Sequence, residues 1–145
     1  MVVDARLKAF PAAATRLVAF LVEKFGFTGP DVSEDSYAGY HLRPWAIWVV
    51  IDERNNTVDT NIFFDDGNRP RLHVPLYRLL VNTGRPAQSA ADSAQTATGM
   101  IRSLTRQAQT LERVLPVLLE APDGRAFMRE AGAWTSGQMR GDPGA

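Results

Sequence analysis

The chain of 145 residues has no cysteine and no excess charge of either sign, since 16 basic residues balance 16 acidic ones. The absence of cysteine excludes disulfides, thiolate metal ligands and cysteine nucleophiles, and it favours a reducing compartment, so we expect a cytoplasmic protein. A net charge of zero provides no general attraction to nucleic acid or to an anionic membrane. We therefore expect neither of these as a partner.

The sequence also lacks long apolar runs and catalytic motifs. No apolar run approaches the roughly 20 residues of a membrane span, and Asp4, Arg6 and Lys8 interrupt the segment where a signal peptide would be apolar. The run Asp65–Asn68 has oxygen ligands but not the twelve-residue spacing of a calcium loop, so it predicts a hairpin turn. No metal and no cofactor is predicted.

Apolar residues at three- and four-residue spacing between Leu7 and Phe25 predict an amphipathic N-terminal helix. Pro11 predicts either a kink or a helix that begins there. Gly26 predicts the end of the helix, with Phe27 folding back onto its last turn. Residues 28–36 are rich in glycine, proline and acidic side chains, which predicts an exposed loop.

Four short apolar-rich runs within residues 37–74 predict an antiparallel meander. Its centre is Trp45–Ile51, which is apolar at every position, and turns are expected at 43–44, 52–57 and 65–69. The predicted fold class is α+β, with an N-terminal helix, a four-stranded antiparallel meander, and a short helix and a long C-terminal helix packed on one face of the sheet.

If each turn closes symmetrically, Ile47 lies opposite both Tyr40 and Ile62, and Ile62 lies opposite Leu72. Opposed residues share a face, so the register divides the strands into two sets. The predicted core face carries Tyr40, Leu42, Trp45, Ile47, Val49, Ile51, Val58, Thr60, Ile62, Phe64, Leu72 and Val74. The opposite face carries Tyr37, His41, Ala46, Trp48, Val50, Asp59, Asn61, Phe63, Arg71 and His73.

The second face is a mixture of aromatic and polar side chains. Aromatic residues and arginine are enriched where protein interfaces carry their binding energy. The candidate binding residues for a protein partner are Tyr37, His41, Trp48, Asp59, Asn61, Phe63, Arg71 and His73. The alternative is that a helix of the same chain covers this face, and the sequence leaves both open.

The two histidines fall on the outer strands of the predicted meander. Three interstrand steps of about 4.8 Å separate His41 from His73, which is too far for one metal ion. Asp59 could reach His73 diagonally and orient its ring, as a histidine that acts as a general base would require. Since neither a nucleophile nor an oxyanion donor accompanies them, no catalytic residue is assigned, and an ordinary surface pair is the alternative.

Pro75 predicts the start of a short helix over 76–81, and a long helix follows over 89–115. Its apolar positions alternate steps of three and four, which is a heptad seam: Ala94, Ala97, Ile101, Leu104, Ala108, Leu111, Leu115 and Leu118. A helix of about 40 Å exceeds a seven-residue strand of about 23 Å, so it must overhang, bend or find another partner. The seam over 94–118 predicts packing on its own sheet or, alternatively, a homodimer.

Pro116 predicts a bend or break directly after the helix over 89–115, and residues 125–131 predict a last short helix. The glycine-rich tail predicts disorder. The domain organisation is therefore a single α+β domain over 1–131 and a disordered tail over 132–145.

Three segments resemble a group of small bacterial α+β proteins, some of which act as immunity proteins or adaptors that neutralise or hold a partner protein. They are Leu21–Phe27, the hairpin Ala46–Ile62 with its central Asp52-Glu53-Arg54, and Leu115–Met128. The resemblance implies a non-enzymatic protein-binding domain that engages a partner through the outer sheet face or the turns. It carries over no functional residues. The alternative is a small enzyme or ligand-binding domain with a pocket between the sheet and the long helix, in which Asp59 and His73 would act.

Overall fold

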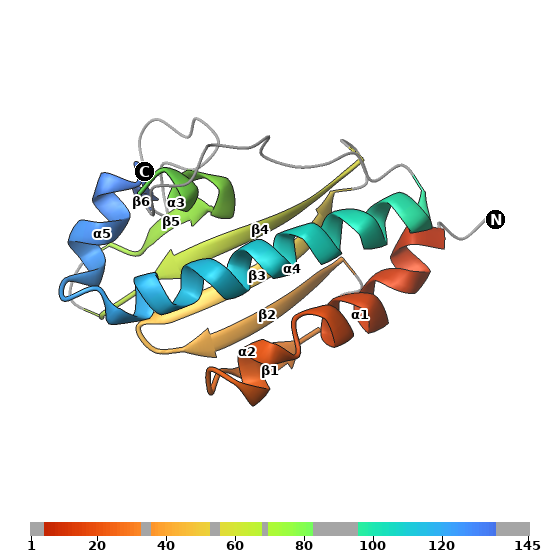
Figure 1. The fold of residues 1–145 in the computed structure, drawn as a ribbon, viewed down its shortest axis with the longest axis horizontal. Coiled ribbons are helices and arrows are strands. Elements are labelled where there is room, and N and C mark those ends of the chain that lie inside the picture. The colour runs from red at the N-terminus through yellow and green to blue at the C-terminus, as the bar shows by residue number, and fades with distance from the viewer. Residues whose placement is uncertain (1–4, 33–35, 53–55, 68–69, 83–95, 136–145) are drawn as a thin grey trace.

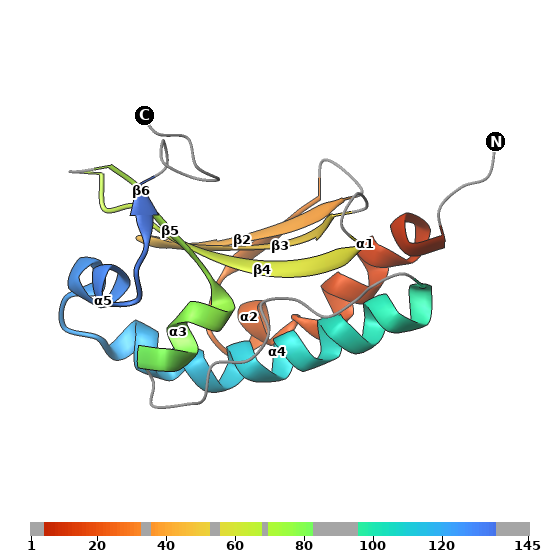
Figure 2. The same cartoon turned by 90° about the horizontal axis from the view of Figure 1, so that it is seen from above.

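The computed structural model describes residues 5–32, 36–52, 56–67, 70–82 and 96–135. It has an α+β fold in which an antiparallel sheet with the strand order β1-β2-β3-β4-β5-β6 packs against a layer of helices (Figure 1). Figure 2 shows α1 to α4 on the same side of the sheet. No helix among the described residues is long and apolar enough to cross a membrane.

The elements follow each other along the chain without a crossover in the sheet. The strands are β1 (Thr28–Asp31), β2 (Tyr37–Leu42), β3 (Trp45–Asp52), β4 (Thr57–Phe64), β5 (Leu72–Pro75) and β6 (Trp134–Thr135). The helices are α1 (Ala5–Leu17), α2 (Phe20–Glu23), α3 (Leu76–Asn82), α4 (Ala97–Glu120) and α5 (Gly124–Glu130). The predicted fold class is confirmed, with two more strands than the expected four.

The N-terminal helical segment ends as expected but does not begin at its proline. Pro11 lies inside α1, which continues to Leu17 before the chain turns into α2. Gly26 has a φ of +82°, and the Phe27 N–H donates at 2.9 Å to the Leu21 carbonyl, six residues earlier. Phe27 therefore folds back onto the last turn as expected, through a bond one residue wider than the six-to-one bond of a Schellman cap. Phe27 is 2% exposed, so the cap also closes one end of the core.

The register of the first two hairpins is confirmed. Tyr40 lies opposite Ile47, and Ile47 lies opposite Ile62. Burial alternates at every residue along β3 and β4, with Ile47 and Ile62 fully buried. The expected core face therefore packs under the helices.

The expected register of the third hairpin is wrong by two residues. Phe64 lies opposite Leu72, and Ile62 lies opposite Val74 rather than Leu72. The connection is longer than a symmetrical 65–69 turn, because the chain does not re-enter the sheet until Leu72. Gly67, at a φ of +81°, donates its N–H to Asp65 in this connection at 2.9 Å. A shift of two residues leaves every side chain on its expected face.

Both edge strands were missed. Residues 28–31 were expected in a loop, but they form β1, in which Thr28 lies opposite His41. Three of these four residues are exposed, so the strand lacks the apolar alternation that would reveal it. Trp134 and Thr135 lie in the predicted tail and form β6, while residues 136–145 lie outside the described residues.

The long helix packs on its own chain. Thr96 caps α4 by accepting the Gly99 N–H at 3.0 Å. The helix continues through the exposed Pro116, so of the predicted bend or break, the break is wrong. The expected start near residue 89 and the seam residue Ala94 lie outside the described residues. The buried residues of α4 are Met100, Ser103, Leu104, Ala108, Leu111, Val114, Leu115 and Leu118.

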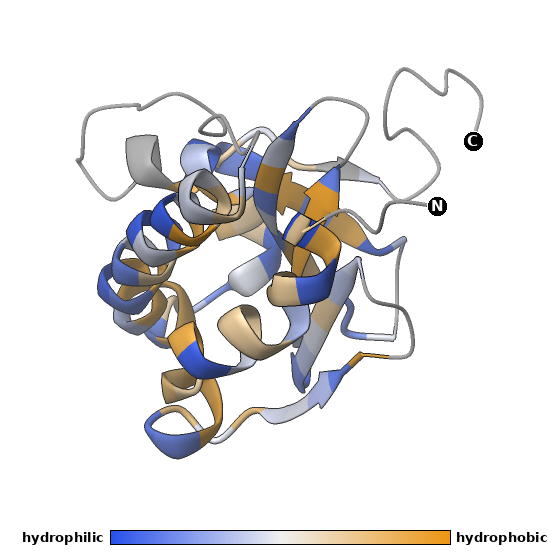
Figure 3. Cartoon of the chain, turned by 90° about the vertical axis from the view of Figure 1, so that its right-hand side faces the viewer, coloured by the Kyte–Doolittle hydropathy of each residue, from blue (hydrophilic) through white to orange (hydrophobic). Residues whose placement is uncertain are grey.

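The length mismatch between the long helix and the sheet is resolved by other helices. At 24 residues α4 spans about 36 Å, and it contacts α1, α3 and α5 in addition to β4. Figure 3 shows its hydrophilic residues on the outside of the helical layer and its hydrophobic residues towards the sheet. From Leu104 to Leu118 the seam thus packs in the core of one chain, whereas Ala97 and Ile101 are half-buried.

Thr60, the polar exception on the core face, takes part in a hydrogen-bond network with α4. Its hydroxyl donates to Gln107 Oε1 at 2.8 Å. The Gln107 amide donates to the Val58 carbonyl at 2.6 Å and to Ser103 Oγ at 3.0 Å. This network satisfies polar groups that would otherwise be costly to bury beneath the helix.

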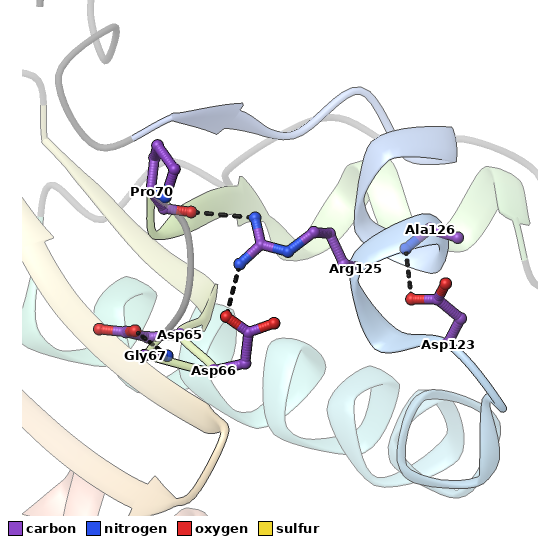
Figure 4. Close-up of polar contacts among 7 residues, drawn as sticks. All are labelled: Asp65, Asp66, Gly67, Pro70, Asp123, Arg125 and Ala126. Atoms are coloured by element: carbon purple, nitrogen blue, oxygen red, sulfur yellow. Dashed lines mark hydrogen bonds and ion pairs between the residues drawn. The ribbon is translucent and has the colours of Figure 1, made fainter.

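A buried arginine joins the β4–β5 connection to the last helix (Figure 4). Arg125 donates to the Pro70 carbonyl at 3.1 Å and to the Asp66 carboxylate at 2.8 Å. Its guanidinium carbon also lies 5.4 Å from the centre of the Phe64 ring. Asp123 caps α5 by accepting the Ala126 N–H at 3.1 Å, which fixes the turn of helix that presents Arg125.

Candidate functional site

The face of the sheet turned away from the helices, here called the outer face, has no described helix over it (Figure 2). It is formed by alternate residues of β2, β3, β4 and β5: Tyr37, Gly39, His41, Ala46, Trp48, Val50, Asp52, Thr57, Asp59, Asn61, Phe63 and His73. Most of these residues are half-buried, so they retain some accessible surface, whereas Gly39 and His73 are buried. The eight predicted binding residues all lie on this face or, for Arg71, at its margin.

Trp48 is the centre of one aromatic cluster. Its ring centroid lies 4.7 Å from that of Tyr37 and 5.9 Å from that of His41, both on the neighbouring strand. Gly39 lies between these two residues on β2 and directly opposite Trp48. Because Gly39 has no side chain, the indole packs against the β2 backbone, where a Cβ atom would lie 2.7 Å from its ring.

Phe63 is the centre of a second cluster on β4 and β5. The His73 ring stacks on it at 4.6 Å between centroids and 19° between planes. The guanidinium carbon of Arg71 lies 5.0 Å from the Phe63 centroid, within the range of a cation–π contact. His73 is 8% exposed, so it contributes little accessible surface to the outer face.

Asn61 is a polar partner of His73. His73 Nε2 lies 3.0 Å from Asn61 Oδ1. The two-residue shift of the third hairpin places Phe63 opposite His73, so Asp59 lies four residues, or about 13 Å, further along β4. The expected Asp59–His73 approach is therefore wrong, although both residues occupy the same face. Asp59 instead accepts a hydrogen bond from Thr57 at 3.3 Å.

The histidines are separated as expected from the register. His41 lies opposite Ala46, Ala46 opposite Phe63, and Phe63 opposite His73, which makes three interstrand steps. Within the described ranges, no three histidine, cysteine, aspartate or glutamate side chains gather closely enough to hold a metal ion.

The sequence identified the aromatic members of the outer face but missed three of its other residues. Gly39 and Thr57 were not assigned to this face, and Asp52 was assigned only to a turn. Strand parity could have placed all three, since Gly39 lies midway between Tyr37 and His41 and the other two are opposite each other at the strand ends.

The outer face thus brings together two aromatic clusters and several amide and carboxylate groups. Comparisons of the chain with protein-family models, with curated proteins and with solved structures return no match.

Proposed function

We propose that the chain is a non-enzymatic protein-binding domain that engages a partner protein through the outer face. The observation that carries the proposal is the pair of half-buried aromatic residues, Trp48 and Phe63, on a sheet face with no described helix over it. Aromatic residues in such positions, with an arginine beside them, supply most of the binding energy at protein interfaces. Arg71 contributes that arginine at the margin of the face.

The resemblance to bacterial immunity and adaptor proteins supports a finer form of the same proposal. In this form the domain holds or neutralises its partner in the cytoplasm, a compartment that suits a chain without cysteine. A homodimer through the 94–118 seam is the less favoured partner, because Leu104, Leu111 and Leu118 are already buried within one chain.

The alternative, a small enzyme or ligand-binding domain, depended on Asp59 and His73. It has less support, since Asn61 occupies the position next to His73 that a catalytic carboxylate would need. The neighbouring genes distinguish the two functions at low cost. A toxin or secreted effector gene favours the binding protein, whereas a metabolic operon favours the enzyme.

The test compares two double variants of the full chain. Trp48→Ala/Phe63→Ala removes the aromatic surface of the outer face. Val22→Ala/Val117→Ala removes two exposed apolar side chains, 41% and 45% exposed, from the helical side of the molecule. The partner captured by the wild type is identified by mass spectrometry, purified and titrated against all three proteins.

We expect the outer-face variant to bind at least about tenfold more weakly, since a binding hot spot contributes 2 kcal/mol or more, while the helical-side control binds as the wild type does. Circular dichroism confirms that both variants fold. A folded outer-face variant that binds the purified partner with unchanged affinity would exclude this face as the binding surface.

A further inference from the structure

Val50 occupies a position on the outer face that two kinds of side chain surround. Tyr37 and Asp59 lie directly opposite it on the two neighbouring strands. Trp48 and Asp52 are the next residues of β3 on the same face, one on each side of it. All five are half-buried, so an accessible apolar base is bordered by two aromatic rings and two carboxylates.

The local contacts keep the rings and the carboxylates on different sides of this base. The Tyr37 and Trp48 rings lie 4.7 Å apart and are tilted by 56°, so they form a corner rather than a flat stack. Thr57, directly opposite Asp52, donates to Asp59 at 3.3 Å. This bond directs the Asp59 carboxylate towards the end of the sheet where Asp52 lies.

These groups are complementary to an organic cation. Aromatic faces attract an ammonium or guanidinium group within about 6 Å of the ring, and carboxylates provide the opposite charge. The aliphatic stem of a lysine or arginine matches the apolar Val50 side chain. An acidic group at the same place would meet two like charges.

The geometry points to a cation site above Val50, in which Tyr37, Trp48, Asp52 and Asp59 recognise a lysine or arginine side chain of the partner protein. This inference rests on the proposed function, because it names the chemistry of the group that the outer face binds. It adds that the partner presents a basic side chain at this site. The attraction is local, because this protein as a whole has no net charge.

The probe is the blocked peptide acetyl-Gly-Arg-Gly-amide, and its control is the same peptide with citrulline, which has nearly the same shape but no charge. The readout is the indole N–H resonance of Trp48 in the full chain, assigned with a Trp48→Phe variant. We expect a saturable shift in the millimolar range with the arginine peptide that weakens as salt is raised, and no saturable shift with citrulline. Equal shifts with both peptides, or none with either, would overturn the cation site.

Two variants locate the site. We expect Asp52→Asn/Asp59→Asn to weaken binding of the arginine peptide by about fivefold or more, because both carboxylates border the cation. Glu23→Gln changes charge on the exposed surface of α2, so it should leave the affinity unchanged. If Glu23→Gln weakens binding of the arginine peptide as much as the double variant does, any surface carboxylate attracts the peptide and the proposed site is wrong.

The cation site and the proposed function fail in different ways. If the purified partner needs Trp48 and Phe63 but binds the Asp52→Asn/Asp59→Asn variant normally, the outer face is the binding surface and the cation site is wrong. If the arginine peptide binds as expected but the partner binds the Trp48→Ala/Phe63→Ala variant as tightly as the wild type, the site exists but the proposed use of the outer face is wrong.

Discussion

Gly39 and Trp48 lie directly opposite each other on β2 and β3, and the indole occupies the space that a side chain at residue 39 would need. The first prediction follows from this contact. Gly39→Ala places a methyl group 2.7 Å from the ring, so the indole must move. We expect a loss of about 1–3 kcal/mol in the free energy of unfolding, as in other overpacked sites, measured by urea denaturation.

A double-variant cycle provides the control. In a Trp48→Ala background the added methyl group has no ring to displace, and alanine is preferred over glycine in a strand. The cost of Gly39→Ala should therefore fall to zero or become a gain. An equal cost in both backgrounds would mean that the indole does not determine the requirement for glycine.

The buried network beneath α4 gives the second prediction. Gln107→Ala leaves the Thr60 hydroxyl and the Val58 carbonyl without their partner in α4. We expect a loss of about 1–3 kcal/mol in the free energy of unfolding. Gln109→Ala, at an exposed position of the same helix, should change it by less than about 0.5 kcal/mol. Similar losses in the two variants would show that the network contributes nothing beyond helix propensity.

The third prediction concerns the anchor between α5 and the β4–β5 connection. Arg125→Ala removes two hydrogen bonds, one of them to a carboxylate, from a side chain that is only 10% exposed. We expect thermal and urea denaturation to show a loss of about 2–3 kcal/mol in the free energy of unfolding. The matched control is Arg129→Ala on the exposed side of α5. Equal losses in the free energy of unfolding for the two variants would show that the hydrogen bonds of Arg125 add no stability.

Tyr40 gives the fourth prediction, on the dependence of stability on pH. Burial raises the pKa of the Tyr40 phenol above its ordinary value of 10.0, and the Thr15 side chain offsets part of that rise. The unfolded chain therefore loses this proton at a lower pH than the folded chain does. The stabilisation is fully present below about pH 10 and decreases as pH rises towards the folded pKa.

Denaturation at a series of pH values from 8 to about 11 measures this loss. Tyr40→Phe should show a smaller alkaline decrease in the free energy of unfolding than the wild type. Tyr77→Phe retains Tyr40 and serves as the control for the other groups that titrate in this range. Identical alkaline slopes for wild type and Tyr40→Phe would contradict the assignment to Tyr40.

Local patterns predicted the centre of the fold because strand alternation and short turns are encoded close together in the sequence. The run Trp45–Ile51 is apolar at every position, so its two faces followed from the assumption of symmetrical turns at 43–44 and 52–57, which the structure confirms. The Gly26 cap was readable because its left-handed φ favours glycine and the following Phe27 is apolar.

Other parts depended on distant contacts that no local pattern contains. The third hairpin was shifted because its connection is longer than a symmetrical turn, and this connection bonds to Arg125, which lies more than fifty residues away. Because of that shift, Asn61 lies beside His73 where Asp59 was expected, so the expected Asp59–His73 pair does not form. Strand β1 carries almost no apolar signal, since it pairs at an edge and remains exposed.

The two edges of the sheet bear on how the domain meets other proteins. Strand β1 has only four residues, its pairing with β2 is irregular, and Pro30 has no N–H to donate to a further strand. At the other edge, the described part of β6 is Trp134–Thr135. Strand β1 is a poor template for strand addition, so its edge of the sheet is protected against growing edge to edge into aggregates. A partner that docks on the sheet would then be recognised by side chains of the outer face and not by backbone pairing at this edge. Substitutions on the outer face could therefore change the partner selectivity of the domain and leave the core intact.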